Sequence, residues 1–409
     1  MAYIVTLRQF HTLWKSDPSH GIRTLESGVS FSSIRIMLTD ADGDTIPDGI
    51  ETLLLARFRP YYRFSSNYGD DEQYPPTSYL AFIQLSRLMQ RTFYTPIPLP
   101  TDHAAPVPIV VDNVVIDWGL LAANPAQILT FNNGAANLTR FPDKTQYLLQ
   151  VQSNFYHGYI ENDGISAVTR WADIVAQGNL GMHGHVAPDI NGNYSVEFWQ
   201  FYAYNYAAAG GLFDHVGDLE HVKLIIDAQT LKPISVYHSV HGKDVLFEMG
   251  EIQPVVAGNV AEYRGENYDT GYIDLYAPYG GIGRAQNNLV RFYAESRPDG
   301  TFGDYTHPVV YIEYGTHATW PSEHWVYVGA PSHDGDTHQF LTTAPPNLGE
   351  VTKPLSVEAS IIMQFNGCWG TYTGPGGDNP PSPCLHNAWQ WPPSEAAFRS
   401  SIPDSAFQG

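Results

Sequence analysis

The chain has 409 residues, of which 43% are hydrophobic and 15% charged, and its formal net charge is −21. A chain of this length can bury a large core and hold one large or two moderate domains. The acidic excess argues against nucleic acid as a partner, because phosphates need Lys and Arg. It also argues against direct electrostatic binding to anionic membranes, unless bound cations bridge the two surfaces. No apolar run approaches the roughly 20 residues that cross a bilayer. The compartment stays open, and the acidity favours secretion slightly over a cytoplasmic location.

The predicted elements, taken in chain order, favour a mainly β protein. Residues 34–38 alternate like an entry strand, and helices are predicted at about 49–58, 79–92 and 167–177. From residue 195 onward strands dominate, and they are predicted at 195–206, 221–227, 233–238, 246–252, 261–264, 289–295, 308–315 and 324–328. Short strands separated by turn signals indicate a two-sheet β-sandwich, with its core from about 140 to 370.

The predicted organisation has two parts. Residues 1–139 form an N-terminal segment with a calcium-binding loop and helices, and residues 140–409 form the β-sandwich domain. The Gly/Pro/Ser-rich end of the chain, from about residue 370, is expected to wrap the surface of the sandwich as an extended tail rather than to form a domain of its own.

A 12-residue acidic loop gives the sharpest local signal. Its oxygen-bearing positions 1, 3, 5, 7, 9 and 12 are Asp40, Asp42, Asp44, the carbonyl of Ile46, Asp48 and Glu51, the ligand spacing of a calcium loop. Thr45 stands at position 6, where an EF-hand has Gly, and the Asp-Gly-Asp-x-x-Pro-Asp-Gly form resembles the loops of thrombospondin type 3 repeats and dockerins. Because five carboxylates this close would repel one another without a cation, we predict a structural Ca²⁺ site here.

A second candidate metal site lies in the segment 214–221, just after an aromatic run. On an extended chain Asp218 and Glu220 point to the same face, and His215 can join them if the chain bends at Gly217. One imidazole and two carboxylates suit a divalent cation: Mg²⁺, Ca²⁺ and Mn²⁺ prefer the oxygens, and Zn²⁺ prefers the nitrogen. The alternative is a set of polar residues at a strand entrance with an internal Asp–His pair.

Other His and Cys residues have positions that matter for function. His183 and His185, two residues apart, would share a face of an extended chain. His241 follows a predicted strand and His317 ends another, so either could reach the metal site as a general base. No nucleophile elbow and no phosphate-binding Gly loop is present. Cys368 and Cys384 either form a disulfide or remain two reduced thiols.

Several segments together resemble the vacuolar protein sorting-associated protein 62 family. They are residues 56–64, 71–78, 215–222, 239–242, 314–318 and 365–370. Leu219 stands where that family usually has Trp. The family name comes from a trafficking phenotype and implies no chemistry.

The segment that contains His215 also resembles, more distantly, the Gly-His-Arg-His-Asp-Trp-Glu motif of the necrosis- and ethylene-inducing cytolysins. That resemblance implies a β-sandwich whose metal ligands are His215, Asp218 and Glu220, with identical internal spacing. Asn205 is the nearest candidate for the family's upstream Asp ligand, a departure that leaves the fourth ligand in doubt. His241 and the glycine after it match a downstream His-Gly. The resemblance also implies that the metal holds a glycolipid sugar headgroup.

These observations support two hypotheses on function. In the first, the protein depends on a divalent metal and binds a glycan or lipid headgroup, as a cytolysin-like effector would. In the alternative, it is a metal-dependent hydrolase or lyase acting on a small-molecule substrate, with the same residues holding the metal and His241 or His317 as general base. A purely structural adaptor would leave the histidines unexplained.

Overall fold

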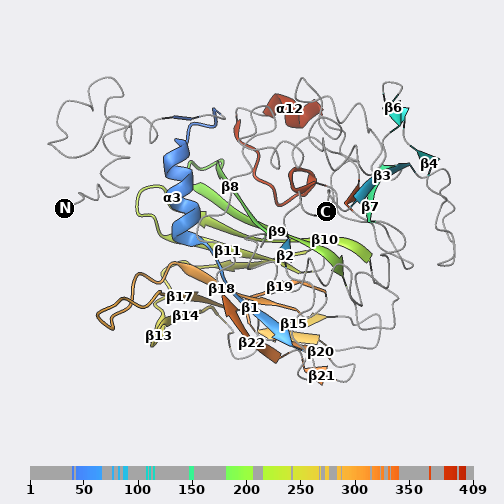
Figure 1. The fold of residues 1–409 in the computed structure, drawn as a ribbon. Helices are drawn as coiled ribbons and strands as arrows, with labels where there is room; N and C mark the ends of the chain where they lie inside the picture. The colour runs from blue at the N-terminus through green and yellow to red at the C-terminus, as the bar shows by residue number, and fades with distance from the viewer. Residues whose placement is uncertain are drawn as a thin grey trace, which may run out of the picture.

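The computed structural model describes a little under half of the chain. The described residues are 39–40, 43–66, 76–77, 82, 86–90, 107–108, 110–111, 114–115, 147–151, 181–205, 215–240, 243–266, 268, 272–275, 283–286, 288–313, 316–322, 324–326, 330–331, 333–339, 368–369, 382–393 and 396–401. Two large β-sheets lie one above the other in these residues, with a helix along one side and the C-terminal segment over one outer face (Figure 1).

The first sheet contains six strands and is antiparallel throughout. Its order is β12 (Lys243–Glu248), β11 (Pro233–Val240), β10 (His215–Ile226), β9 (Tyr194–Asn205) and β2 (Pro76–Thr77), and β8 (Met182–Pro188) also pairs with β9. The long strands β9 and β10 hold one register along their length, from His215 opposite Asn205 to Ile226 opposite Tyr194.

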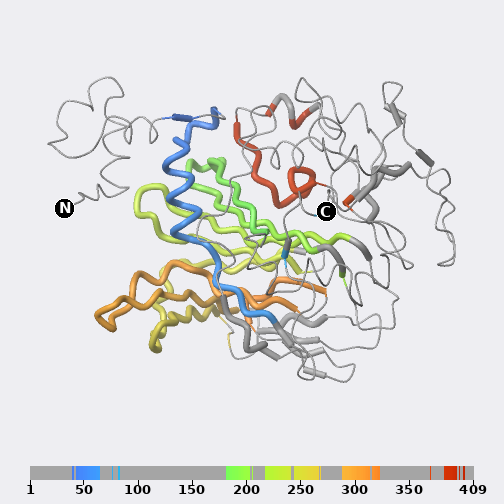
Figure 2. The backbone as a smooth tube through the Cα atoms, viewed as in Figure 1, coloured from blue at the N-terminus to red at the C-terminus, as the bar shows by residue number. Residues whose placement is uncertain are grey.

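The second sheet contains seven strands. Its order is β13 (Val255–Ala257), β14 (Val260–Arg264), β17 (Leu289–Tyr293), β18 (His307–Ile312), β1 (Tyr61–Ser66) and β22 (His333–Gln339), and β19 (Thr319–Trp320) also pairs with β18. The chain runs from the helix α3 (Asp48–Phe58) directly into β1, which enters this sheet parallel to β18 (Figure 2). Strands from before residue 140 therefore belong to both sheets.

Smaller sheets flank these two. They are formed by β15 (Tyr272–Leu275), β16 (Gly283–Gln286), β20 (His324–Val326) and β21 (Ala330–Pro331); by β23 (Cys368–Trp369), β7 (Tyr147–Val151), β3 (Ser86–Gln90) and β4 (Val107–Pro108); and by β5 (Val110–Val111) with β6 (Val114–Val115). The C-terminal region adds a 3-10 helix, η3 (Pro383–Leu385), and α12 (Ala396–Ser401).

The helix predicted at 79–92 is wrong over residues 86–90, which form β3. This strand pairs with β7, and Leu88 lies opposite Leu149. The apolar spacing there also fits a helix, and pairing with a strand some 60 residues later decides the outcome. The entry strand at 34–38 and the helix at 167–177 lie outside the described residues.

The main core lies between the two sheets, which confirms a mainly β protein with a β-sandwich core. The first sheet contributes Met182, Val186, Val196, Phe198, Val222, Leu224, Ile226, Val236 and Phe247, and the second contributes Tyr62, Phe64, Val290, Phe292, Val310 and Ile312. These side chains alternate along their strands with residues of the opposite face, as the two-residue period of a strand requires. Leu54, Leu55 and Phe58 of α3 belong to the same cluster.

The helix predicted at 49–58 is confirmed as α3. It ends at Phe58, two residues before Pro60, because the residue that precedes a proline avoids helical backbone angles. Its buried side chains at positions 50, 54, 55 and 58 share one face, and Leu55 packs directly on Gly184 of β8. Among the described residues, no helix combines the length and apolar character needed to cross a membrane.

Most predicted strands are confirmed with small shifts. β9, β11, β14, β17, β18 and β20 fall within the predicted ranges or within one to three residues of them. β10 begins six residues earlier than predicted, at His215, so the candidate metal segment is part of the strand. β12 ends at Glu248 rather than at residue 252.

Candidate functional site

The residues of the predicted metal site lie on β9 and β10, at the end of the first sheet. His215 is opposite Asn205, Asp218 is opposite Tyr202, and Glu220 follows two positions on along β10. Gly217 has φ 82°, so the chain departs from extended geometry between His215 and Asp218, where the spacing predicted a bend. The side chain of His215 lies outside the described part of the structure.

Asp218 is the centre of the hydrogen bonding at this site. Its Oδ2 lies 3.0 Å from Nδ1 of His317 and accepts a 3.3 Å hydrogen bond from Nδ2 of Asn205. Its Oδ1 accepts the backbone N–H of Leu219 at 3.0 Å. The imidazole of His317 is fully buried and stacks on Tyr202, with ring centroids 3.8 Å apart. The structure thus brings together Asn205, Asp218 and His317, which are distant in sequence.

Glu220 lies in an environment that disfavours its charge. Burial raises the pKa of this carboxyl well above its ordinary range, Asp218 raises it further, and the hydroxyl of Ser239 acts in the opposite direction. Glu313 and Asp244 also raise it. These last two carboxylates are not predictable from the sequence, because nothing in the local pattern around residue 313 or 244 indicates that it lies near residue 220.

Residues 313 and 316–320, which follow β18 of the second sheet, form one side of the site. They are joined by two backbone hydrogen bonds of 3.0 Å, from His317 N to Glu313 O and from Glu313 N to Ala318 O. Nε1 of Trp320 donates to Oε2 of Glu313 at 3.3 Å. Regular pairing of β10 with β11 stops at Val222.

Beyond that point the hydroxyl of Thr319 lies between the two strands. Its Oγ1 is 3.1 Å from the carbonyl of His221 on β10 and 2.9 Å from that of Ser239 on β11. Residues 316–320 therefore occupy the space where β10 and β11 separate. This position places His317 against Asp218.

Two acceptor atoms at the site are buried without a hydrogen-bond partner in the described part of the chain. They are Oδ1 of Asn205 and Oε2 of Glu220, whose residues are 9% and 5% exposed. Buried acceptors of this kind are costly unless a donor or a cation lies beside them. The described residues contain no group of three or more His, Cys, Asp or Glu side chains that could hold a metal ion, a set that does not include the side chain of His215.

The predicted calcium loop has the local geometry of a tight acidic turn. Oδ1 of Asp40 accepts the N–H of Gly43 at 2.7 Å, and its Oδ2 accepts the N–H of Thr45 at 3.1 Å. Oδ1 of Asp44 accepts the N–H of Ile46 at 2.6 Å. Glu51, at the last ligand position, is fully buried on α3. The residue at position 3 of the loop, Asp42, lies outside the described residues.

Thr45 has φ 84° at the loop position where an EF-hand has Gly. A β-branched residue in this region is strained by about 1–2 kcal/mol. We expect Thr45→Gly to stabilise the protein by up to about 1 kcal/mol, because Gly removes the strain but loses some entropy on folding. Thermal unfolding with calcium present measures this, and Thr45→Ala, which keeps a Cβ, is the control. An unchanged or lower melting temperature in Thr45→Gly would contradict the prediction.

The remaining predicted residues lie elsewhere. His183 and His185 are both buried on one face of β8, as their spacing predicted. Cys384 is buried in η3, and the side chain of Cys368 is outside the described part, so the disulfide and the two reduced thiols both stay alternatives. His241 also lies outside the described residues.

Comparisons with known proteins give little support for a family. No family model matches the chain, so the resemblance to the vacuolar protein sorting-associated protein 62 family stays a prediction. No curated protein matches it either. A solved structure that matches is "Necrosis and Ethylene inducing Protein 2 from the causal agent of cocoa's Witches Broom disease", at 12% identity and a TM-score of 0.24. The match covers 46% of this chain and 57% of that one, and a TM-score this low carries no argument on fold or function.

Proposed function

We propose that the protein is a divalent-cation-dependent binding protein whose cation is held by Asp218, Glu220, Asn205 and His215. The observation that carries the proposal is the pair of buried acceptors, Oε2 of Glu220 and Oδ1 of Asn205, beside the buried carboxylate of Asp218. A buried cluster of acids is stable when its groups are protonated, paired or bound to a cation. Carboxylate and amide oxygens are the ligands that Ca²⁺ and Mg²⁺ prefer, and the imidazole of His215 would widen the choice to Mn²⁺ or Zn²⁺.

The environment of His317 favours binding over the enzyme alternative. This imidazole is fully buried, stacked on Tyr202 and held against Asp218. A general base must come within hydrogen-bond reach of a substrate, whereas a side chain packed in this way is suited to fixing the orientation of a carboxylate ligand. His317 therefore has a positioning role in this proposal, and the ligand is a glycan or lipid headgroup held by the cation, as a cytolysin-like effector would bind it.

The test of the cation site uses the full chain and isosteric variants. We expect Asp218→Asn and Glu220→Gln each to lower the affinity for one divalent cation by at least roughly tenfold. Glu248→Gln, an exposed position on β12 of the same sheet, should leave it unchanged. Elemental mass spectrometry of the purified proteins and calorimetric titration with Ca²⁺, Mg²⁺, Mn²⁺ and Zn²⁺ measure this. If both variants keep the cation content and affinity of the parent, the site is an ordinary buried acid cluster.

The ligand is tested separately. We expect vesicles that carry a glycosylated sphingolipid to bind the protein in the presence of the cation, and EDTA to remove the binding. Vesicles of phosphatidylcholine alone are the control. Binding that survives both EDTA and Asp218→Asn would show that recognition is independent of the cation.

A second cation, Ca²⁺, is proposed for the loop that begins at Asp40. Its support is the ligand spacing together with the buried Asp44 and Glu51. Asp44→Asn should remove this ion and leave the one at Asp218 in place, so the two sites can be distinguished in one elemental measurement.

A further inference from the structure

The outer face of the first sheet carries many polar side chains although it is covered. Those on β8, β9 and β10 are His183, His185, Ser195, Glu197, His221 and Lys223, and they share the face with the apolar Ala187, Trp199, Phe201 and Leu219. All are buried except the side chain of Lys223, which is 13% exposed. An antiparallel sheet with one apolar and one polar face normally turns the polar face to water. The polar residues of this face are therefore typical of an exposed surface, although a further element covers the face in this protein.

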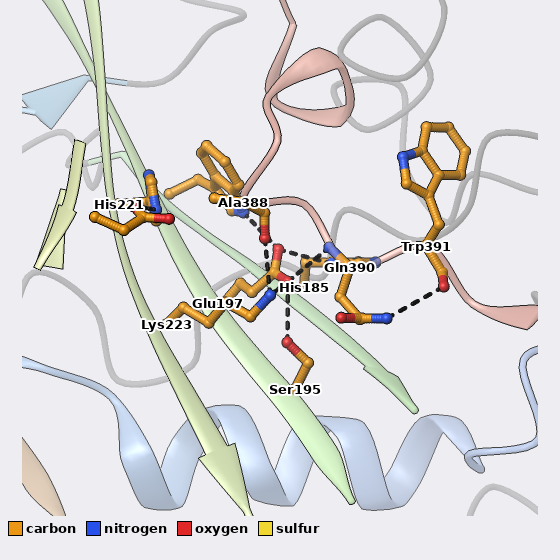
Figure 3. A network of polar contacts seen from close by, with 10 residues as sticks. His185, Ser195, Glu197, His221, Lys223, Ala388, Gln390 and Trp391 are labelled. Carbon is orange, nitrogen blue, oxygen red and sulfur yellow. Dashed lines mark hydrogen bonds and ion pairs between the residues drawn. The ribbon is translucent and has the colours of Figure 1, made fainter. Parts of the chain in front are cut away.

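The covering element is the segment 382–391, which is called the latch below. It crosses the outer face of the sheet in Figure 1, and Figure 3 shows its contacts at close range. The backbone N–H of Gln390 donates to Oε1 of Glu197 at 2.9 Å, and Nζ of Lys223 donates to the carbonyl of Ala388 at 2.9 Å. Between these two anchors, the ring of Trp389 stacks on His185 with centroids 3.6 Å apart.

Side chains of the sheet itself supply most of the hydrogen-bond and charge partners of the Glu197 carboxylate. Oε1 accepts the hydroxyl of Ser195 at 3.0 Å and lies 3.6 Å from Nζ of Lys223, while Oε2 accepts Nε1 of Trp199 at 3.1 Å and lies 3.1 Å from Nδ1 of His185. Gln390 supplies one partner in addition to these four. Departure of the latch would therefore leave no isolated charge behind, and water could replace its two main-chain hydrogen bonds.

We propose that this outer face is a peptide-binding site, and that the latch is its intramolecular ligand and opens as a unit while the sandwich stays folded. The recognised ligand is an Ala-Trp-Gln peptide that leaves a turn, which the N–H of Trp389 closes by donating to the carbonyl of His386 at 3.1 Å. Its alanine carbonyl accepts a hydrogen bond from Lys223, its indole stacks on His185, and its glutamine N–H donates to Glu197. This inference does not rest on the cation site. A tethered ligand has an effective concentration that can reach the millimolar range, so it would exclude a micromolar competitor.

The test uses the full chain with Trp389→Ala, and Gln390→Pro as a second variant that removes the N–H donated to Glu197 and leaves the side chains of the sheet unchanged. Hydrogen exchange is followed by mass spectrometry. We expect the region of Gln390 to exchange at least roughly tenfold faster in both variants, since each loses one latch anchor, whereas β9 and β10 exchange at the parent rate. Trp391→Ala, two residues on, is the matched control and should not open the latch.

Binding in trans provides the second measurement. A labelled synthetic peptide of residues 382–393, with Cys384→Ser to prevent oxidation, should bind the Trp389→Ala protein saturably and the parent at least roughly tenfold more weakly. The same peptide carrying Trp389→Ala should not bind. The proposal is overturned if β9 and β10 lose protection together with the latch, or if the latch stays closed in both variants. It is also overturned if the latch opens and the peptide does not bind.

Discussion

Replacing Glu197 by Gln is expected to lower the free energy of unfolding by about 3 kcal/mol at pH 7. The carboxylate is fully buried, and burial by itself raises its pKa. Electrostatic interactions with His185 and Lys223 and the hydrogen bonds of His185 and Trp199 outweigh burial, and together they lower the pKa from the ordinary 4.5 to about 2. A pKa that is lower in the folded state means that folding favours the charged form. A neutral amide loses this contribution and leaves Lys223 without its counter-charge.

The pH dependence gives this prediction a definite sign. Because the folded-state pKa of Glu197 is depressed, its contribution is fully present above pH 4.5 and is lost as the pH falls from 4.5 through about 2. The stability difference between parent and Glu197→Gln should therefore be constant from pH 7 to about 5 and shrink toward pH 2. Denaturant titrations followed by tryptophan fluorescence at several pH values measure the difference.

The control for this series is Glu248→Gln on the exposed part of β12. It should change the stability by less than about 0.5 kcal/mol, as most surface substitutions do. Equal stability of the parent and Glu197→Gln at pH 7 would mean that the donors around the carboxylate only compensate for its burial.

The contact between α3 and β8 gives the second large effect. A Cβ added at Gly184 would lie 2.5 Å from Cδ2 and 2.6 Å from Cδ1 of Leu55, and the side chain of Leu55 is itself buried in the core. We expect Gly184→Ala to cost about 1–3 kcal/mol by overpacking, and Leu55→Ala to cost about 2–5 kcal/mol by leaving a cavity.

The two changes should compensate each other. In the double variant the new methyl group of residue 184 occupies part of the space left by Leu55, so its loss of stability should be smaller than the sum of the single losses by about 0.5–3 kcal/mol. Gly265→Ala, where a Cβ has its nearest neighbour at 3.4 Å, is the control for a glycine without a close contact. Additive losses would mean that the helix shifts away from β8 in the Gly184→Ala protein.

The sequence predicted the fold where the information is local. Pro60 and the acidic turn before Asp48 define α3, and alternating apolar residues define β9, β11 and β18. The helix prediction is wrong at residues 86–90 for the opposite reason, because their secondary structure depends on the partner strand at 147–151. β1 was also not recognised as a strand, although Tyr62 and Phe64 alternate as core residues do.

At the candidate site, too, local features are predictable from the sequence and long-range contacts are not. The spacing of Asp218 and Glu220 and the bend at Gly217 can be read from eight consecutive residues. The contact of His317 with Asp218 crosses 99 positions and depends on how the second sheet meets the first. Nothing local signals Glu313 beside this site. The sequence does carry a signal for Glu197. A lone acid between Val196 and Phe198 in an aromatic strand needs a partner on the same face.

The parallel pairing of β1 with β18 has a consequence for the order of events during synthesis. Tyr61 pairs with Val309, and the other neighbour of β1, β22, comes later still. At about 5–20 residues per second, a ribosome would need roughly 10 to 50 seconds to make the chain between the two partners. During this interval β1 and the apolar face of α3 have been made, but β18 and β22, the two neighbours of β1 in the second sheet, have not. Over that time we expect the nascent protein to depend on chaperones, which would bind the apolar side chains of α3 and the core side chains Tyr62 and Phe64 of β1.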